Sequence, residues 1–152
     1  MLLIIFSASV LVAGTVTVHA AGLAVLLRSL RKWRDLPPMR FWPITRLLIR
    51  TAWCLILFHL AEIAVWGLFY RWQGCLPDAE AAFCFSGVTY TTIGYGDLVL
   101  AEPWRMLAPI EGLTGILMCG LSTGFFVAVV SRIHQSLPVN TTGGLTTERT
   151  PQ

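Results

Sequence analysis

The stretch Thr91-Thr92-Ile93-Gly94-Tyr95-Gly96-Asp97 decides the fold of this chain. Two glycines alternate with bulkier residues in it, and glycine adopts positive φ angles that a residue with a Cβ resists. The stretch follows a largely apolar segment, residues 79–90, which favours a helix too short to span a membrane. Such polar backbone is tolerated at membrane depth only where it is buried in protein or lines a pore. The pattern therefore indicates a chain that enters a membrane and turns back.

The composition supports a membrane location. Of the 152 residues, 55% are hydrophobic and 12% are charged, which is too apolar for an ordinary soluble domain. Long apolar blocks cover residues 1–27, about 47–70 and 106–130, each near the ~20 residues that span hydrocarbon. The sequence predicts an all-α membrane protein with three transmembrane helices and a re-entrant helix.

The first apolar block has a second interpretation, because Val18-His19-Ala20 loosely resembles the cleavage site of a signal peptide. However, no basic residue precedes Arg28, and the apolar run is longer than that of a usual signal. We therefore expect residues 1–27 to form an N-terminal transmembrane helix that packs through small residues such as Gly14 and Gly22.

Basic residues predict the orientation of the chain. Seven of them lie between the first two apolar blocks or just beyond: Arg28, Arg31, Lys32, Arg34, Arg40, Arg46 and Arg50. By the positive-inside rule residues 28–46 form a cytoplasmic or interfacial segment, which places the N-terminus outside and the C-terminus in the cytoplasm. The net charge of +3 then suits contact with anionic lipid head groups and gives no indication of nucleic-acid binding.

Two further segments complete the predicted organisation. Residues 77–90 are expected to form the re-entrant helix, with Pro77 in its first turn and Asp78 and Glu80 at the positive end of its dipole. Residues 133–152 are rich in Thr, Gly and Pro, which predicts a disordered cytoplasmic tail.

The stretch at residues 91–97 has the composition of a cation filter. A dehydrated potassium ion needs several oxygens at fixed spacing, and backbone carbonyls of four facing strands can supply them. The stretch resembles the potassium-channel signature, and the resemblance extends over residues 47–132 as a two-helix pore domain. The chain is thus similar to a small prokaryotic member of the potassium-channel pore-domain family, with an extra N-terminal helix. Ile93 stands where many members have Val.

The resemblance implies a function and a set of site residues. It implies passive, potassium-selective conduction across a prokaryotic inner or plasma membrane, with K⁺ ions in the filter and no organic cofactor. The ions would be coordinated by Thr92, Ile93, Gly94 and Tyr95. Support would come from Thr89, Thr91, Gly96 and Asp97, with Thr89 hydrogen-bonded to the Tyr95 hydroxyl. Because one chain carries one such loop, the partners would be three identical subunits of a homotetramer.

The third long helix carries two further expectations. Gly115 lies within one residue of the family's hinge glycine, so it is a candidate gating hinge, and close packing of small residues is the equal alternative. Ile116, Cys119 and Thr123 are expected to line a cavity below the filter.

Ionisable residues inside the apolar blocks must face protein or water, since each would cost several kcal/mol in lipid. Glu62, one helical turn from His59, and Glu111 are therefore candidates for proton-sensitive gating. The alternative, which we favour, is that their hydrogen bonds brace the re-entrant helix. His19 carries less weight.

One departure from the family concerns Asp97. Counting back from Gly-Tyr-Gly-Asp, the positions that hold the filter aspartate in a well-known bacterial relative are Val88 and Cys84, and a tryptophan that braces the filter tyrosine there is Phe85 here. Neither Val88 nor Phe85 can hydrogen-bond through its side chain. Asp97 must find water, backbone amides or a group from the third long helix.

Other function classes fit less well. No nucleophile with a base, metal cluster or phosphate loop indicates an enzyme. A weakly selective cation channel and a non-conducting accessory or scaffold subunit remain alternatives. The sequence carries no arginine-repeat voltage sensor or regulatory domain, so it does not specify what opens the pore.

Overall fold

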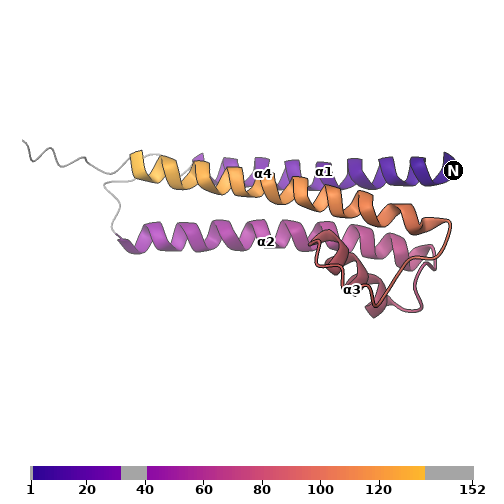
Figure 1. Ribbon diagram of the computed structural model, residues 1–152. Helices are drawn as coiled ribbons and strands as arrows, with labels where there is room; N and C mark the ends of the chain where they lie inside the picture. The colour runs from indigo at the N-terminus through magenta and orange to yellow at the C-terminus, as the bar shows by residue number, and fades with distance from the viewer. Residues whose placement is uncertain (1, 32–40, 136–152) are drawn as a thin grey trace, which may run out of the picture.

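The computed structural model describes residues 2–31 and 41–135 of the chain, all-helical apart from turns and links. The elements in order are α1 (Leu2–Arg31), α2 (Phe41–Trp72), α3 (Ala79–Tyr90), the 3₁₀ turn η1 (Trp104–Met106) and α4 (Leu107–Gln135). Figure 1 shows α1, α2 and α4 as three long helices lying along one direction. The short α3 lies at the end of the bundle where α1 begins and α2 ends.

Three helices are long and apolar enough to cross a membrane, spanning Leu2–Leu30, Trp42–Trp72 and Trp104–Gln135. All three apolar blocks of the sequence are therefore helical, as predicted. The helices run further than expected, because α1 continues through Arg28 and α2 already includes Arg46. Basic side chains at helix ends can extend along the helix towards the head groups, so they do not stop it.

Two expected segments thus differ in extent. Only residues 32–40 of the basic segment expected at 28–46 lie between helices, and they lie outside the described residues. The tail expected from residue 133 begins inside α4, which ends at Gln135, and the remainder is also outside the described part.

The short helix α3 begins two residues later than expected. Asp78 is its N-cap, with extended backbone and a carboxylate that accepts a hydrogen bond from the Ala81 amide at 2.8 Å. Pro77 therefore precedes the cap and does not lie in the first turn. Glu80 is in that turn, where a negative charge is stabilised by the helix dipole.

The core lies where α3 meets the long helices. Trp66 and Tyr70 of α2 are completely buried there, together with Leu107 of α4. The Tyr70 and Phe85 rings pack edge to face, with centroids 5.4 Å apart. A Cβ on Gly67 would come within 2.7 Å of the Phe83 ring, so glycine allows α2 and α3 to approach closely. This core fixes α3 against the bundle.

The N-terminal helix is part of the same bundle, since α1 packs against both α2 and α4. One small residue of α1, Gly22, makes the close helix contact that was expected. A Cβ on it would lie 2.9 Å from the Phe58 ring of α2. Gly14, in contrast, has nothing within 4 Å.

Candidate functional site

The backbone of residues 91–97, the filter stretch, has an alternating conformation. Positive φ angles fall on every second residue, with 61° at Thr92, 56° at Gly94 and 77° at Gly96. Such alternation allows successive carbonyls to point to one side of a strand. A β-branched residue at positive φ is uncommon, and such positions cluster at functional sites. This alternation of φ is compatible with the carbonyl filter that the sequence predicts at residues 91–97.

The end of α3 is hydrogen-bonded to the filter stretch. The Thr91 amide donates to the Gly87 carbonyl at 3.1 Å and the Thr91 hydroxyl to the same carbonyl at 2.6 Å. The Thr92 amide donates to the Thr89 carbonyl at 3.0 Å. The amides of Ile93 and Gly94 both donate to the Val88 carbonyl, at 2.9 and 3.2 Å. The position of α3 therefore determines the position of the first filter residues.

The side chains of the filter stretch are open in a single chain. Tyr95 is 71% exposed and Ile93 57% exposed. Among the described residues, Thr89 forms no hydrogen bond with the Tyr95 hydroxyl, so the bond expected from the sequence is not formed within one chain. Thr89 contacts the filter stretch through its backbone carbonyl, which accepts a hydrogen bond from the Thr92 amide.

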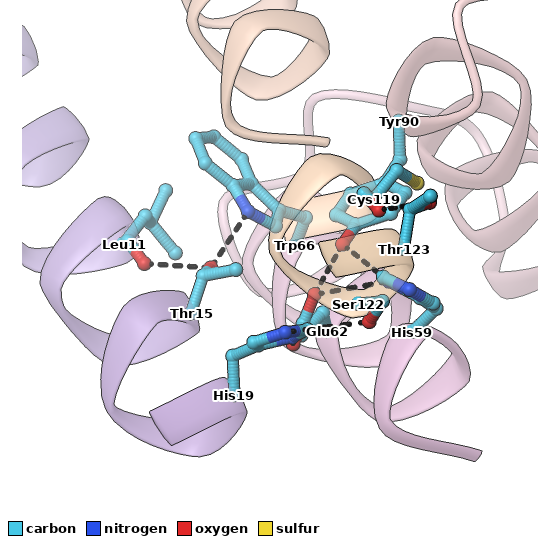
Figure 2. A network of polar contacts seen from close by, with 10 residues as sticks. All are labelled: Leu11, Thr15, His19, His59, Glu62, Trp66, Tyr90, Cys119, Ser122 and Thr123. Carbon is cyan, nitrogen blue, oxygen red and sulfur yellow. Dashed lines mark hydrogen bonds and ion pairs between the residues drawn. The ribbon is translucent and has the colours of Figure 1, made fainter. Parts of the chain in front are cut away.

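A buried polar network, the Glu62 network, holds the other side of the α3 terminus (Figure 2). The Tyr90 hydroxyl donates to Glu62 Oε2, while His19 Nδ1 lies 2.7 Å from Glu62 Oε1. His59 Nδ1 lies 2.9 Å from the Tyr90 hydroxyl and 3.5 Å from Glu62 Oε2. Glu62 is 0% exposed and His19 only 1%. Because Tyr90 is the last residue of α3, the network links α1 and α2 to the start of the filter stretch.

Two more contacts join α1 to this region. The Trp66 indole donates to the Thr15 hydroxyl at 3.0 Å, and that hydroxyl donates to the Leu11 carbonyl at 2.9 Å. Ser122 Oγ of α4 lies 3.4 Å from His19 Nε2. His19 thus pairs with Glu62 inside the bundle, a contact that was not predicted from the sequence. The rule that an ionisable group within the membrane needs a partner, applied to His19 as to Glu62, would have indicated the pairing.

Glu111 of α4 forms a second buried cluster behind α3. The Tyr70 hydroxyl donates to Glu111 Oε2 at 2.8 Å, and Ser86 Oγ lies 2.5 Å from Glu111 Oε1 and 2.9 Å from the Ile63 carbonyl. Ser86 therefore contacts both the Glu111 carboxylate and the Ile63 carbonyl through one hydroxyl. The cluster ties α2, α3 and α4 together, as the bracing alternative expects.

A comparison with protein-family models matches residues 52–132 to an ion channel family, which is more than half of the chain. The chain belongs to this ion channel family. The matched region runs from α2 through α3 and the filter stretch to α4 and leaves out α1. No curated protein and no solved structure gave a match. The chain is thus an integral membrane protein of an ion channel family and not an enzyme, with three candidate spans.

Asp97 of the ion channel lines a cavity of about 300 Å³ behind the filter stretch. Cys84, Phe85 and Val88 line the same cavity from α3, at the three positions where the sequence lacks the relative's polar partners. Arg105 of η1 also lines it, a cation that no sequence motif indicates at this place. Asp97 and Arg105 form no direct ion pair among the described residues, and the cavity is large enough to hold water between them.

Gly115 lies against the end of α3. A Cβ built on it would lie 2.0 Å from the Tyr90 carbonyl oxygen, far inside any real contact. Gly120 and Gly124 of the same helix have nothing within 4 Å. This contact supports the packing alternative for Gly115 and offers no separate support for a hinge.

Gly115→Ala is expected to destabilise the assembled channel, because α4 must move away from the Tyr90 carbonyl to make room for a methyl group. Overpacking of a tight contact costs typically about 1–3 kcal/mol, so the melting temperature of the purified protein should fall clearly. Gly120→Ala is the matched control on the same helix. Equal melting temperatures for the two variants would contradict the packing role.

The three residues expected to line a cavity occupy an open face of α4. Ile116 is 58% exposed, and Cys119 and Thr123 are also exposed in the single chain, where the Thr123 hydroxyl donates to the Cys119 carbonyl at 2.9 Å. Leu113 and Leu117 are open as well, at 70% and 56%. These side chains are exposed in one chain, and a pore would form only between chains. Their role in lining the pore therefore stays a prediction.

Proposed function

We propose that this ion channel is potassium-selective and conducts K⁺ passively through a ring of backbone carbonyls from Thr92, Ile93, Gly94 and Tyr95. The observation that carries the proposal is the alternation of positive φ at Thr92, Gly94 and Gly96 directly after α3. These residues lie within the region, residues 52–132, that matches the ion channel family. A carbonyl ring replaces the hydration shell of the ion.

The proposal requires four chains, because one chain supplies a single filter strand. Two observations support assembly. The filter side chains Ile93 and Tyr95 are open in the single chain, and α4 presents a row of large exposed apolar residues that includes Leu113, Ile116 and Leu117. Neighbouring copies of the chain would cover both.

The end of α3 supports cation conduction electrostatically. Its C-terminal residues Val88 to Tyr90 lie next to the filter stretch, and the C-terminus of a helix carries a partial negative charge of about half an elementary charge. In a tetramer four such ends would converge on the ion pathway. This arrangement favours cations over anions.

The proposed orientation has the N-terminus outside and the C-terminus in the cytoplasm. Figure 1 shows the first residues of α1 at the same end of the bundle as α3, and the end of α4 at the opposite end. Arg28, Arg46 and Arg50 lie near that opposite end, in the last turn of α1 and the first turns of α2. The filter stretch would then be on the outer side of the membrane.

Potassium uptake tests conduction directly. Purified protein is reconstituted into liposomes that contain high internal K⁺, and uptake of a tracer such as ⁸⁶Rb⁺ is followed. We expect uptake that depends on the protein and collapses when an ionophore removes the K⁺ gradient. An accessory or scaffold subunit would give no uptake above protein-free vesicles, although it reconstitutes equally well.

A further inference from the structure

Three metal-ligating side chains of two helices meet inside the Glu62 network. His19 of α1 and His59 and Glu62 of α2 each offer one ligand atom, and these atoms all lie within 4.8 Å of one another. We propose that these three residues bind a divalent transition metal ion, with zinc as the best fit. The matched family region does not include α1, which supplies one of the three ligands. The site does not depend on which ion permeates the channel.

One ion can draw the three ligand atoms together, since they lie within 4.8 Å of one another, and the two shortest distances join His19 and His59 to different oxygens of the Glu62 carboxylate. With bonds of about 2.0–2.1 Å, neighbouring ligand atoms around zinc lie roughly 3.3 Å apart. Glu62 Oε2 and His59 Nδ1 are already 3.5 Å apart. His19 Nδ1 and Glu62 Oε1, at 2.7 Å, share a hydrogen bond that the ion would replace, and they need to separate by about half an ångström.

The surroundings provide the remaining features of a metal site. The Tyr90 hydroxyl, 2.9 Å from His59 Nδ1, is placed to be the fourth ligand or to hold a water there. On the far side of the His19 ring, Ser122 Oγ lies 3.4 Å from Nε2, where it can accept a hydrogen bond from the Nε2 N–H of the tautomer whose Nδ1 is free to bind metal. Such outer hydrogen bonds orient the imidazoles of metal sites.

Burial and ligand type select the ion. His19 and Glu62 are almost completely buried, and His59 is 19% exposed. Two imidazoles and one carboxylate suit Zn²⁺, Ni²⁺ or Cu²⁺, whereas Mg²⁺ and Ca²⁺ prefer sites made of oxygen ligands. A bound ion would fix α1 to α2 beside Tyr90, and thus hold the end of α3 in its packed position.

Direct binding tests the proposal on the purified full-length protein after chelator treatment. Calorimetric titration with ZnCl₂ should give about one high-affinity ion per chain, and excess MgCl₂ should not compete. His19→Gln and His59→Gln should each lower the affinity about tenfold or more, in line with the losses seen when metal sites are disturbed. His134→Gln is the matched control, since the exposed His134 lies far along α4, and its affinity should equal that of the wild type.

Two measurements on the wild-type protein keep the test decisive even if a variant fails to assemble. Zinc should raise the melting temperature, because a ligand that binds only the folded state stabilises it. X-ray absorption of the zinc-loaded protein should show nitrogen and oxygen ligands at about 2.0–2.2 Å. A sulfur ligand at about 2.3 Å, unchanged affinity in both histidine variants, or loss of binding in His134→Gln would overturn the proposal.

Discussion

Gly94→Ala is expected to abolish selective potassium conduction while the protein still assembles. Gly94 has φ of 56°, a conformation that costs a residue with a Cβ about 1–2 kcal/mol, and the cost would recur in each chain of the proposed tetramer. Nothing lies within 4 Å of the added methyl in the chain, so the substitution acts on the backbone and not through a clash. The strand should relax to another φ and lose the alignment of its carbonyls.

The matched control is Gly74→Ala. Gly74 has φ of 62° and also has nothing within 4 Å, but it lies in the link between α2 and α3, outside the filter stretch. Both variants therefore suffer similar backbone strain, and only Gly94→Ala should lose K⁺ selectivity in a reversal-potential measurement. Wild-type selectivity in Gly94→Ala, or equal loss in Gly74→Ala, would remove the filter assignment.

Glu62→Ala should strongly destabilise the protein. The substitution leaves His19 and the Tyr90 hydroxyl buried without their shared acceptor, and each buried polar group that loses its partner costs about 1–3 kcal/mol. Glu62→Gln keeps one acceptor oxygen and should lose less. The melting temperature of the purified protein measures both effects.

Glu102→Ala is the control, because Glu102 is an exposed carboxylate in the link after the filter stretch. It should melt close to the wild type, as surface substitutions usually do. If Glu62→Ala and Glu102→Ala had the same melting temperature, the Glu62 network would not brace the end of α3.

The fold could be predicted because its main signals are local in the sequence. An apolar run of sufficient length defines a candidate span, and a short apolar run before a glycine-rich polar stretch defines the re-entrant helix α3. The start of α3 does not follow from the sequence alone, because Pro77 and Asp78 both suit a helix start and only the Asp78 side-chain hydrogen bond shows which residue caps it. The helix ends at Arg31 and Phe41 could not be read from charge alone, since basic side chains do not interrupt a helix.

The candidate site was predictable only where it rests on adjacent residues. The glycine positions of the filter stretch follow from the sequence, and their positive φ angles were expected. The pairing of His19 with Glu62 joins residues from two different helices, so periodicity within one helix does not reveal it. Likewise, the tight contact of Gly115 with the Tyr90 carbonyl distinguishes packing from a hinge only once α3 and α4 are placed together.

The reversal potential under bi-ionic conditions tests the central claim most directly. The purified wild-type protein is placed in a planar bilayer with KCl on one side and NaCl at equal concentration on the other. A filter of backbone carbonyls predicts a reversal potential near that of a K⁺ electrode, with K⁺ far more permeant than Na⁺. A reversal potential near zero, with current carried equally by both cations, would contradict a potassium-selective filter at residues 91–97.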